Sequence, residues 1–345
     1  MSGKANSRVI YFDILNILAC FAVLVLHHNG IVHNYNVNTL AWKQALVFEV
    51  LFYWAVPIFF MLTGATLFTY REKYSTRVFF MRRFSRAVVP FLIWSCIFYF
   101  YGNYTDLLPI FSFPQFIDSV FNTRNIPFID VYWFFIHLFS LYMIIPVLSL
   151  LKDNVRILIY IVAMIFITHS VFPLLFQFLG VYYNWAIIFP MAGYSIYLIL
   201  GYLCSKINLN GEQRLLIYIL GIISLLIRYY GTYYLSLSDG VLNRTFFSYM
   251  YFHTVFLAMS IFVFIKYELR LSSHPHLISI IRNLSSCSLG IYLIHKFIMD
   301  LELNMLHTQV DNVYWRFLGA FMTYGICLIV VMLGKRIPYL RVIFP

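Results

Sequence analysis

The chain has few charged residues, and this shortage excludes a soluble globular protein. Only 11% of its 345 residues are Asp, Glu, Lys or Arg, whereas 62% are hydrophobic. A typical soluble domain has about a quarter charged residues and about half apolar residues. Together with a mean hydropathy of +0.82, this composition predicts an integral membrane protein.

Cysteine is also scarce, and its positions exclude a cysteine-based metal cluster or a disulfide framework. The five cysteines lie singly within apolar runs and never in the CxxC spacing that is typical of zinc sites. We interpret them as small core residues and expect no bound metal.

Long apolar runs of about 20 residues recur, the length that a helix needs to cross the hydrocarbon core of a membrane. Helices are the expected spanning element because backbone groups in lipid must be satisfied within the segment. The first run contains Asp13 and lacks a small-residue cleavage site, so we expect it to stay in the membrane. We predict ten transmembrane helices in one membrane-embedded domain over residues 1–345, at 9–29, 47–70, 87–101, 131–151, 157–176, 186–204, 215–234, 246–266, 285–303 and 315–334.

The positive charge is distributed unevenly between the two sides of this all-α bundle. Its net charge of +11 can indicate nucleic-acid binding, but the basic residues fall between the apolar runs, so we expect no nucleic-acid partner. With a cytoplasmic N-terminus, the inner side receives all of the 24 Lys and Arg except Lys43, Arg124, Arg228, Arg244, Lys296 and Arg316. The positive-inside rule therefore predicts that both termini are cytoplasmic. The longest polar connection, residues 102–130, is expected to cover a pocket or to hold short helices.

A polar seam is predicted along the first helix. Asn16 and His27 are eleven residues apart, which is about 1100° of rotation, so they share a face within about 20°. Asp13 falls within about 40° of the same face, whereas His28 points about 100° away. A neutral imidazole can take a proton from a hydroxyl group, so His27 is a candidate general base. The alternative is that both histidines simply sit at the membrane interface.

The second predicted helix combines a kink with small residues. Pro57 permits the kink, and the pair Thr63 and Gly64 allows a backbone or a ligand to approach closely. Helix packing is the alternative interpretation of this pair. Glu49, at the outer end of the helix, is a candidate to orient or acidify an imidazole of the first helix.

An arginine cluster precedes the third predicted span. Arg82, Arg83 and Arg86 have i, i+1, i+4 spacing before Pro90. Such a group can anchor the inner face to anionic lipid head groups. Guanidinium forks also suit phosphate oxygens, so the cluster is equally a candidate site for a phosphorylated cytosolic donor.

The ninth predicted helix carries a second set of ionisable residues. His295 and Lys296 fall about 15 Å along the span, with Asp300 and Glu302 nearer the outer side. Ionisable groups within a span usually face the bundle interior and mark functional sites. For His295 the alternative is a hydrogen bond within the core.

Five segments in this order resemble the integral-membrane acyltransferase family 3: DILNILACFAVLVLH, VPIFFMLTGATLF, FMRRFSRAVVP, YWFFIHLFSLYMIIP and SLGIYLIH. The resemblance covers nearly the whole chain. The layout is most similar to the small single-domain members that O-acetylate bacterial envelope polysaccharides, among them the acetyltransferase of enterobacterial common antigen.

The resemblance implies an enzyme of the bacterial inner (cytoplasmic) membrane that takes an acyl group from cytoplasmic acetyl-CoA or another acyl-CoA. The implied acceptor is a hydroxyl of an envelope polysaccharide or a lipid-linked glycan. The helix-one histidine of the family corresponds to His27, its basic motif to Arg82 and Arg83, its late histidine to His295, and its aromatic motif to Trp133.

Two positions depart from the family pattern. Thr63 stands where the family commonly has serine, and it keeps a hydroxyl group. Asn16 stands where the family usually has Arg or Lys, and it replaces a permanent cation with a neutral donor and acceptor. Arg8, about 12 Å away along the axis, could supply the charge only by bending inward. A different acyl donor and an inactive relative are the alternatives that this substitution leaves open.

The hypothesis that combines these residues is acyl transfer with His27 as general base, supported by Asn16 and Asp13. The arginine cluster binds the phosphates of the donor, and His295 or Lys296 stabilises the oxyanion that forms at the thioester. Because His27 lies roughly 25 Å from the inner boundary, either the donor's arm threads a pore or an acyl relay exists. The residues expected to contact the substrates are Glu49, Thr63, Trp133 and Lys296.

Two other classes of protein are compatible with a helical bundle of this kind. A transporter or flippase for a lipid-linked glycan would also use aromatic cavity walls, and 20% of the residues are aromatic. Donor dependence distinguishes the two, since a transporter needs no acyl-CoA. A purely structural membrane subunit leaves both the arginine cluster and the seam on the first helix unexplained.

Overall fold

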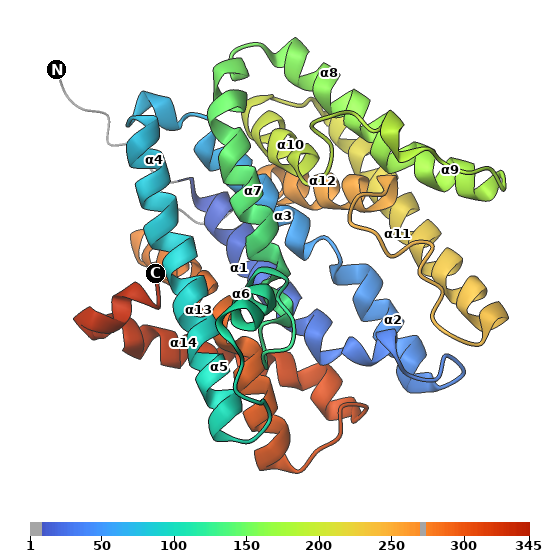
Figure 1. Ribbon diagram of the computed structural model, residues 1–345. Helices are drawn as coiled ribbons and strands as arrows, with labels where there is room; N and C mark the ends of the chain where they lie inside the picture. Colours follow the sequence, from blue (N-terminus) through green and yellow to red (C-terminus); the bar gives the residue numbers. More distant parts are fainter. Residues whose placement is uncertain (1–8, 270–273) are drawn as a thin grey trace.

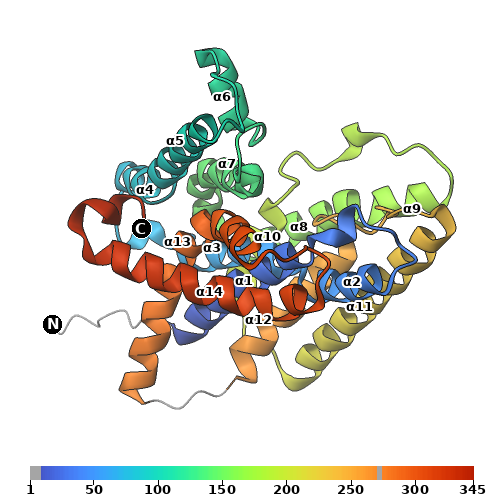
Figure 2. The same ribbon diagram turned by 90° about the horizontal axis from the view of Figure 1, so that it is seen from below.

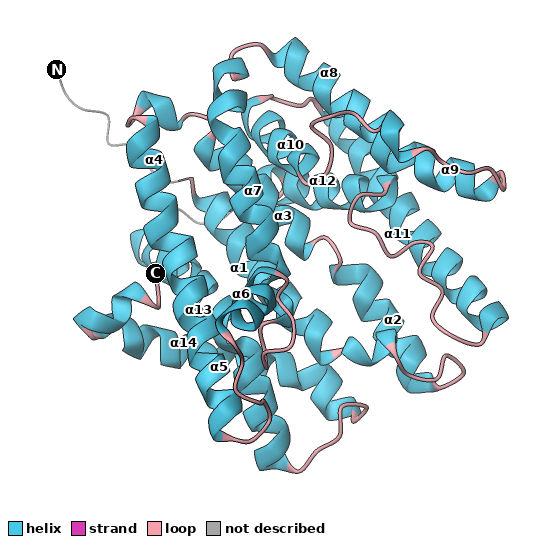
Figure 3. Ribbon diagram, in the orientation of Figure 1, coloured by secondary structure: helices cyan, strands magenta, loops and turns pink. Residues whose placement is uncertain are grey.

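The computed structural model describes residues 9–269 and 274–345, which form helices and loops with no strand (Figures 1 and 3). The prediction of an all-α protein is confirmed. Lys4, Arg8 and Arg270, which contributed to the predicted charge distribution, lie outside the described residues. The helices are α1 (Ile10–His28), α2 (Leu40–Phe52), α3 (Ala55–Leu67), α4 (Thr76–Arg83), α5 (Val89–Tyr104), α6 (Phe113–Phe121), α7 (Trp133–Leu148), α8 (Val155–Ile165), α9 (Phe172–Phe178), α10 (Ser195–Lys206), α11 (Gly211–Asp239), α12 (Phe252–Tyr267), α13 (Pro275–Leu306) and α14 (Val313–Arg336).

Within the described residues, eight helical stretches are long and apolar enough to cross a membrane. They coincide with eight of the ten predicted spans. The other two predicted spans, 186–204 and 246–266, contain the shorter apolar helices α10 and α12. Both helices begin later than predicted, and Pro190 and Gly193 (φ 99°) lie in the irregular segment before α10. A count of ten spans, with both termini cytoplasmic, stays a prediction.

The second predicted span is broken into two helices rather than kinked. α2 begins at Leu40, where the Thr39 side chain accepts a hydrogen bond from the Trp42 amide, and it ends at Phe52. α3 begins three residues later, and Pro57 lies in its first turn. At that position the missing N–H of proline costs no helical hydrogen bond, so Pro57 starts the new helix instead of bending a longer one.

The arginine cluster lies within a helix that begins well before the third predicted span. α4 continues into α5 through a π-helical segment, Phe84–Val88, so that Thr76–Tyr104 forms one continuous rod (Figure 1). Pro90 cannot donate to the carbonyl of Arg86, which explains why the helix widens just before it. Such π-helical turns are frequent at functional sites.

α1 and α3 occupy the middle of the bundle (Figure 2), and α1 packs against α13, α3, α14, α2 and α12. α3 and α10 cross in backbone contact. A Cβ atom on Gly64 would lie 1.8 Å from the carbonyl oxygen of Leu198, and one on Gly201 would lie 1.9 Å from that of Met61. The close approach expected at Gly64 is therefore helix packing, and the other half of the contact is supplied by α10.

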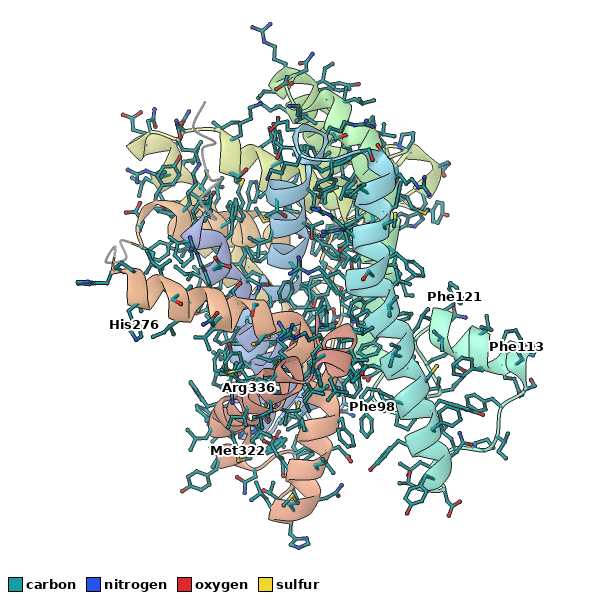
Figure 4. The ribbon with its side chains drawn as sticks, turned by 90° about the vertical axis from the view of Figure 1, so that its left-hand side faces the viewer. Phe98, Phe113, Phe121, His276, Met322 and Arg336 are labelled. Atoms are coloured by element: carbon teal, nitrogen blue, oxygen red, sulfur yellow. The ribbon has the colours of Figure 1, made fainter. Side chains whose placement is uncertain are left out.

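The long connection between α5 and α7 contains the short helix α6, which projects from the bundle (Figures 2 and 4). Ser112 and Gln115 form a capping box at its start. Phe113 and Phe121 point away from the rest of the molecule and are 77% and 64% exposed. The long connection thus holds a short helix, which was one of the two expectations for residues 102–130.

Candidate active site

The polar seam of α1 faces α13, and the two helices run in parallel. Near the N-terminal end of α1, the Asn16 amide donates to the carbonyl oxygen of Ser285 at 2.9 Å and to its hydroxyl at 3.0 Å. Near the other end, the ring centroids of His27 and His295 are 5.1 Å apart. Asn16 and His27 therefore share a face of α1, and the structure brings the two histidines of the resemblance together.

A polar cavity of about 420 Å³ opens at the His27 end of α1, and we call it the outer cavity after the predicted topology. Lys296 lies in its wall with its Nζ atom 3.8 Å from the carboxylate of Asp130. Two imidazoles, an amine and two carboxyl groups thus surround one space, which suits a ligand rich in hydroxyl groups. The polar side chains of its lining are those of His27, His28, Asn34, Asp130, Lys296 and Asp300.

A second cavity, of about 310 Å³, lies at the other end of α1, and we call it the inner cavity. Phe12, Phe59 and Leu62 give it apolar walls, so an acyl chain can be accommodated there. The predicted site residues in its lining are Asp13, Asn16, Thr63, Arg83 and Arg86. Asp13 and Asn16 therefore lie in a different cavity from His27.

An arginine-lined pocket of about 750 Å³ adjoins the inner cavity, and both are lined by Arg83 and Arg86. Arg82 and Arg341 complete the charged lining of this arginine pocket. Arg82 also lies 4.5 Å from the ring centroid of Tyr74. Four guanidinium groups next to an apolar cavity have the chemistry that suits a ligand with a polyanionic end and an apolar end.

Arg341 was missed by the sequence analysis because the segment that carries it is far from the cluster in the chain. It follows α14, in the short 3₁₀ helix Pro338–Val342. The indole of Trp94 donates to the carbonyl of Ile343 at 3.0 Å, and Phe344 packs against Gly334. These contacts fix the segment against the bundle and bring Arg341 to the arginine pocket.

Tyr292 and His295 lie between the inner and outer cavities, and we call them the partition. Tyr292 lines the inner cavity, and its ring centroid is 5.5 Å from that of His295. His295 is fully buried, and its ring lies tilted by 35° against that of His27, which lines the outer cavity. The Tyr292 hydroxyl donates to the carbonyl of Val131, and the Tyr132 hydroxyl donates to that of Leu293 at 2.6 Å. These bonds hold the partition against the short 3₁₀ turn Asp130–Tyr132, which comes just before α7.

His28, next to His27 in the sequence, is held by a buried polar chain. Its Nε2 atom lies 2.9 Å from the hydroxyl of Thr323, which donates to the carboxylate of Glu302. A hydroxyl has one hydrogen, so with Thr323 donating to Glu302, His28 donates to Thr323. His28 also packs on Trp315, with ring centroids 4.2 Å apart. The two adjacent histidines thus have different surroundings. His28 is anchored by Thr323 and Trp315, which the sequence did not indicate as its neighbours.

Glu49 contacts no imidazole of α1, contrary to expectation. Its carboxylate lies 3.6 Å from the guanidinium of Arg228 on α11, and both side chains are almost completely buried. Arg228 in turn lies 3.2 Å from the ring centroid of Tyr53. The reason is that α2 packs against α11, so the buried carboxylate meets a buried cation there.

Two predicted substrate contacts have other neighbours. Trp133 lies in an aromatic group with Tyr194 and Tyr249, at 6.1 and 5.6 Å between ring centroids, and it is outside the linings of the three cavities described above. Thr63 does line the inner cavity, but its hydroxyl donates to the carbonyl of Phe59 at 2.8 Å. Neither residue adjoins His27.

A comparison with protein families gives a match over nearly the whole chain. The family model described as an acyltransferase domain matches residues 9–332. No curated protein and no solved structure matches the chain. The matched range includes α1 and α13, and with them the seam, the partition and most of the lining of both cavities.

Proposed function

The chain belongs to the acyltransferase domain family, and we propose that this membrane acyltransferase takes an acyl group, most simply acetyl, from acyl-CoA at the cytoplasmic side. The acceptor is a hydroxyl of a bacterial envelope polysaccharide or of a lipid-linked glycan. The enzyme works in the bacterial inner membrane and is in contact with membrane lipid.

The observation that carries the proposal is the junction of the arginine pocket with the inner cavity. Arg83 and Arg86 line both spaces. Acyl-CoA has the matching layout, with phosphates at one end and a thioester-linked acyl group at the end of a flexible arm. The guanidinium groups bind the phosphates, and the arm extends along Asn16 and Asp13 into the apolar cavity.

The outer cavity supports the acceptor half of the reaction. His27 takes the proton of the attacking hydroxyl when its imidazole is neutral. Lys296 lines the same cavity, and its side-chain amine can donate a hydrogen bond to the oxyanion that forms at the carbonyl carbon. The anchoring of His28 on Thr323 favours His27 as the base.

The activity is tested by incubating the purified protein with labelled acetyl-CoA and extracted envelope glycolipid, and by mass spectrometry of the products. The acyl mass is expected on a glycan, together with free coenzyme A. Translocation of the glycan without release of coenzyme A would instead support a transporter, which could use the same two cavities.

Two variants with matched controls test the residue roles. His27→Ala is expected to lower the transfer rate by about 10²- to 10⁴-fold, whereas His33→Ala, an exposed histidine outside the outer-cavity lining, leaves it unchanged. Arg83→Ala is expected chiefly to raise the KM for acetyl-CoA. Arg77→Ala is its control, because Arg77 is exposed on α4 and outside the arginine pocket. Full turnover by His27→Ala would remove the base assignment.

A further inference from the structure

The two ring nitrogens of His295 have different surroundings, and this difference fixes the tautomer of the neutral ring. Nδ1 lies 2.7 Å from the carbonyl oxygen of Tyr292. A carbonyl oxygen only accepts hydrogen bonds, so Nδ1 carries the hydrogen. A neutral imidazole has one N–H, and Nε2 therefore carries the lone pair. Among the described residues, no group hydrogen-bonds this buried Nε2 atom.

A buried acceptor without a partner costs about 1–3 kcal/mol, so it is a candidate contact for a ligand. The lone pair also limits what neutral His295 can do. It cannot donate to an oxyanion through Nε2, so of the two expected oxyanion donors only Lys296 fits. What Nε2 can do is accept a proton or attack a carbonyl carbon.

The ring neighbours of His295 distinguish it from the two other buried histidines that have an unpartnered nitrogen among the described residues. The first of these, His28, lines the outer cavity alone and is held through Nε2 by Thr323. His253 on α12 is similar in its bonding, with one nitrogen 3.0 Å from the carbonyl of Phe246 and the other unpartnered among the described residues. Neither His253 nor His295 itself lines the inner or the outer cavity, but the ring neighbours of His253, which are Phe246, Tyr251 and Phe252, line neither of the two cavities. His295, in contrast, has ring contacts both with Tyr292, which lines the inner cavity, and with His27, which lines the outer cavity.

We propose that His295 carries the acyl group from the inner to the outer cavity as an acyl-imidazole. This inference rests on the proposed function and specifies its route. Once the ring of Tyr292 turns aside, Nε2 attacks the thioester carbonyl. A C–N bond forms, the C–S bond breaks, and the thiolate of coenzyme A leaves. The acyl-imidazolium keeps its Nδ1 hydrogen, and the hydrogen bond to the Tyr292 carbonyl strengthens as the ring becomes positive.

The second half of the reaction returns His295 to its starting state. The acceptor hydroxyl attacks the acyl carbon, its proton passes to His27, and the C–N bond breaks with its electron pair returning to Nε2. The proton held by His27 balances the thiolate released in the first half. The sum is one thioester and one alcohol converted into one ester and one thiol, with no other reactant.

The test is rapid mixing of the purified full-length protein with labelled acetyl-CoA in the absence of acceptor. Wild-type protein is expected to release about one equivalent of thiol and to retain the label, which hydroxylamine removes as acetohydroxamate. Peptide mapping is expected to find the acyl mass on His295. This part needs no variant, so it does not depend on whether a substituted chain folds.

Variants distinguish the role of His295 in the first half of the reaction from that of His27 in the second half. His295→Ala is expected to reduce the thiol burst by about 10³-fold or more, and His295→Asn is tested beside it in case the smaller residue disturbs packing. His27→Ala is expected to keep the burst and to accumulate label, because it lacks only the base of the second half. His253→Ala is the matched control and behaves as wild type. Binding of coenzyme A, measured by calorimetry, confirms that each variant is folded.

The possible contrary results point to different errors. A burst of normal size in His295→Ala would overturn the assignment of His295. Glycan acylation by wild-type protein without any acceptor-free burst would show direct transfer, which overturns the relay and leaves the proposed function standing. Failure to release thiol both with and without acceptor would overturn the proposed function itself.

Discussion

The crossing of α3 and α10 predicts a large loss of stability for Gly64→Ala. The new Cβ atom would lie 1.8 Å from the carbonyl oxygen of Leu198, whereas ordinary contacts begin at 3.4 Å. The shortfall is about 1.6 Å, and the obstacle is the backbone of a buried helix, which cannot rotate away as a side chain can. The two helices must therefore separate by about that distance, which removes much of the dispersion energy of their contact.

Overpacking of this kind typically costs about 1–3 kcal/mol. We expect a value near the upper end, about 3 kcal/mol, which corresponds to roughly a 150-fold change in the unfolding equilibrium. Unfolding in detergent, followed by tryptophan fluorescence, measures the effect. Gly325→Ala on α14 is the matched control, since nothing lies within 4 Å of its Cβ position and alanine favours the helix. Equal stability of the two variants would refute the packing argument. Because Thr63 lines the inner cavity, a higher KM for the donor should accompany the loss.

Three further predictions concern other contacts. Arg228→Met should lower the free energy of unfolding by about 3 kcal/mol, because it leaves Glu49 buried without its cation. The double variant with Glu49→Leu should lose less than Arg228→Met alone, and additive losses would contradict the pairing. Asn16→Ala should cost about 1–2 kcal/mol through two hydrogen bonds to α13, and an unchanged unfolding midpoint would contradict their contribution. Hydrogen bonds from Arg124 lower the pKa of Asp118. Their contribution to the stability of α6 is therefore complete above the unfolded pKa of about 3.9, and it is lost as the pH falls through the lower folded pKa. Amide exchange in α6, corrected for the intrinsic rate, should show this loss in wild type and not in Asp118→Asn.

The spans were predictable because membrane crossing sets strong local constraints on length and apolarity. The break between α2 and α3 was not, although Pro57 was visible in the sequence. Its position depends on where α2 turns towards α11, and that is set by packing and by the Glu49–Arg228 pair. Such contacts join residues from distant parts of the chain, and a single sequence carries no sign of them.

In the candidate site, too, features within one helix were predictable from the sequence, whereas contacts between distant parts of the chain were not. The shared face of Asn16 and His27 followed from helical geometry, because both residues belong to one helix. The contact of His295 with His27 depends on the pairing of α1 with α13. The sequence indicated that His295 faces the bundle interior, but not which helix it meets there. Arg341 and Thr323 carried no signal beyond their residue types, since each reaches its position through the packing of α14 and the segment that follows it.

The partition has a physical consequence for any transfer across the membrane. A donor arm that reached His27 through an open pore would leave a path for ions and protons whenever the site was empty. Tyr292 and His295 connect the linings of the two cavities, and reciprocal tyrosine hydroxyl bonds join this part of α13 to the residues just before α7. If these two residues close the path and His295 carries the acyl unit, the donor and the acceptor need not occupy one cavity at the same time. The membrane can then stay closed to ions while the acyl group is transferred, because only the acyl group has to pass the ring of His295.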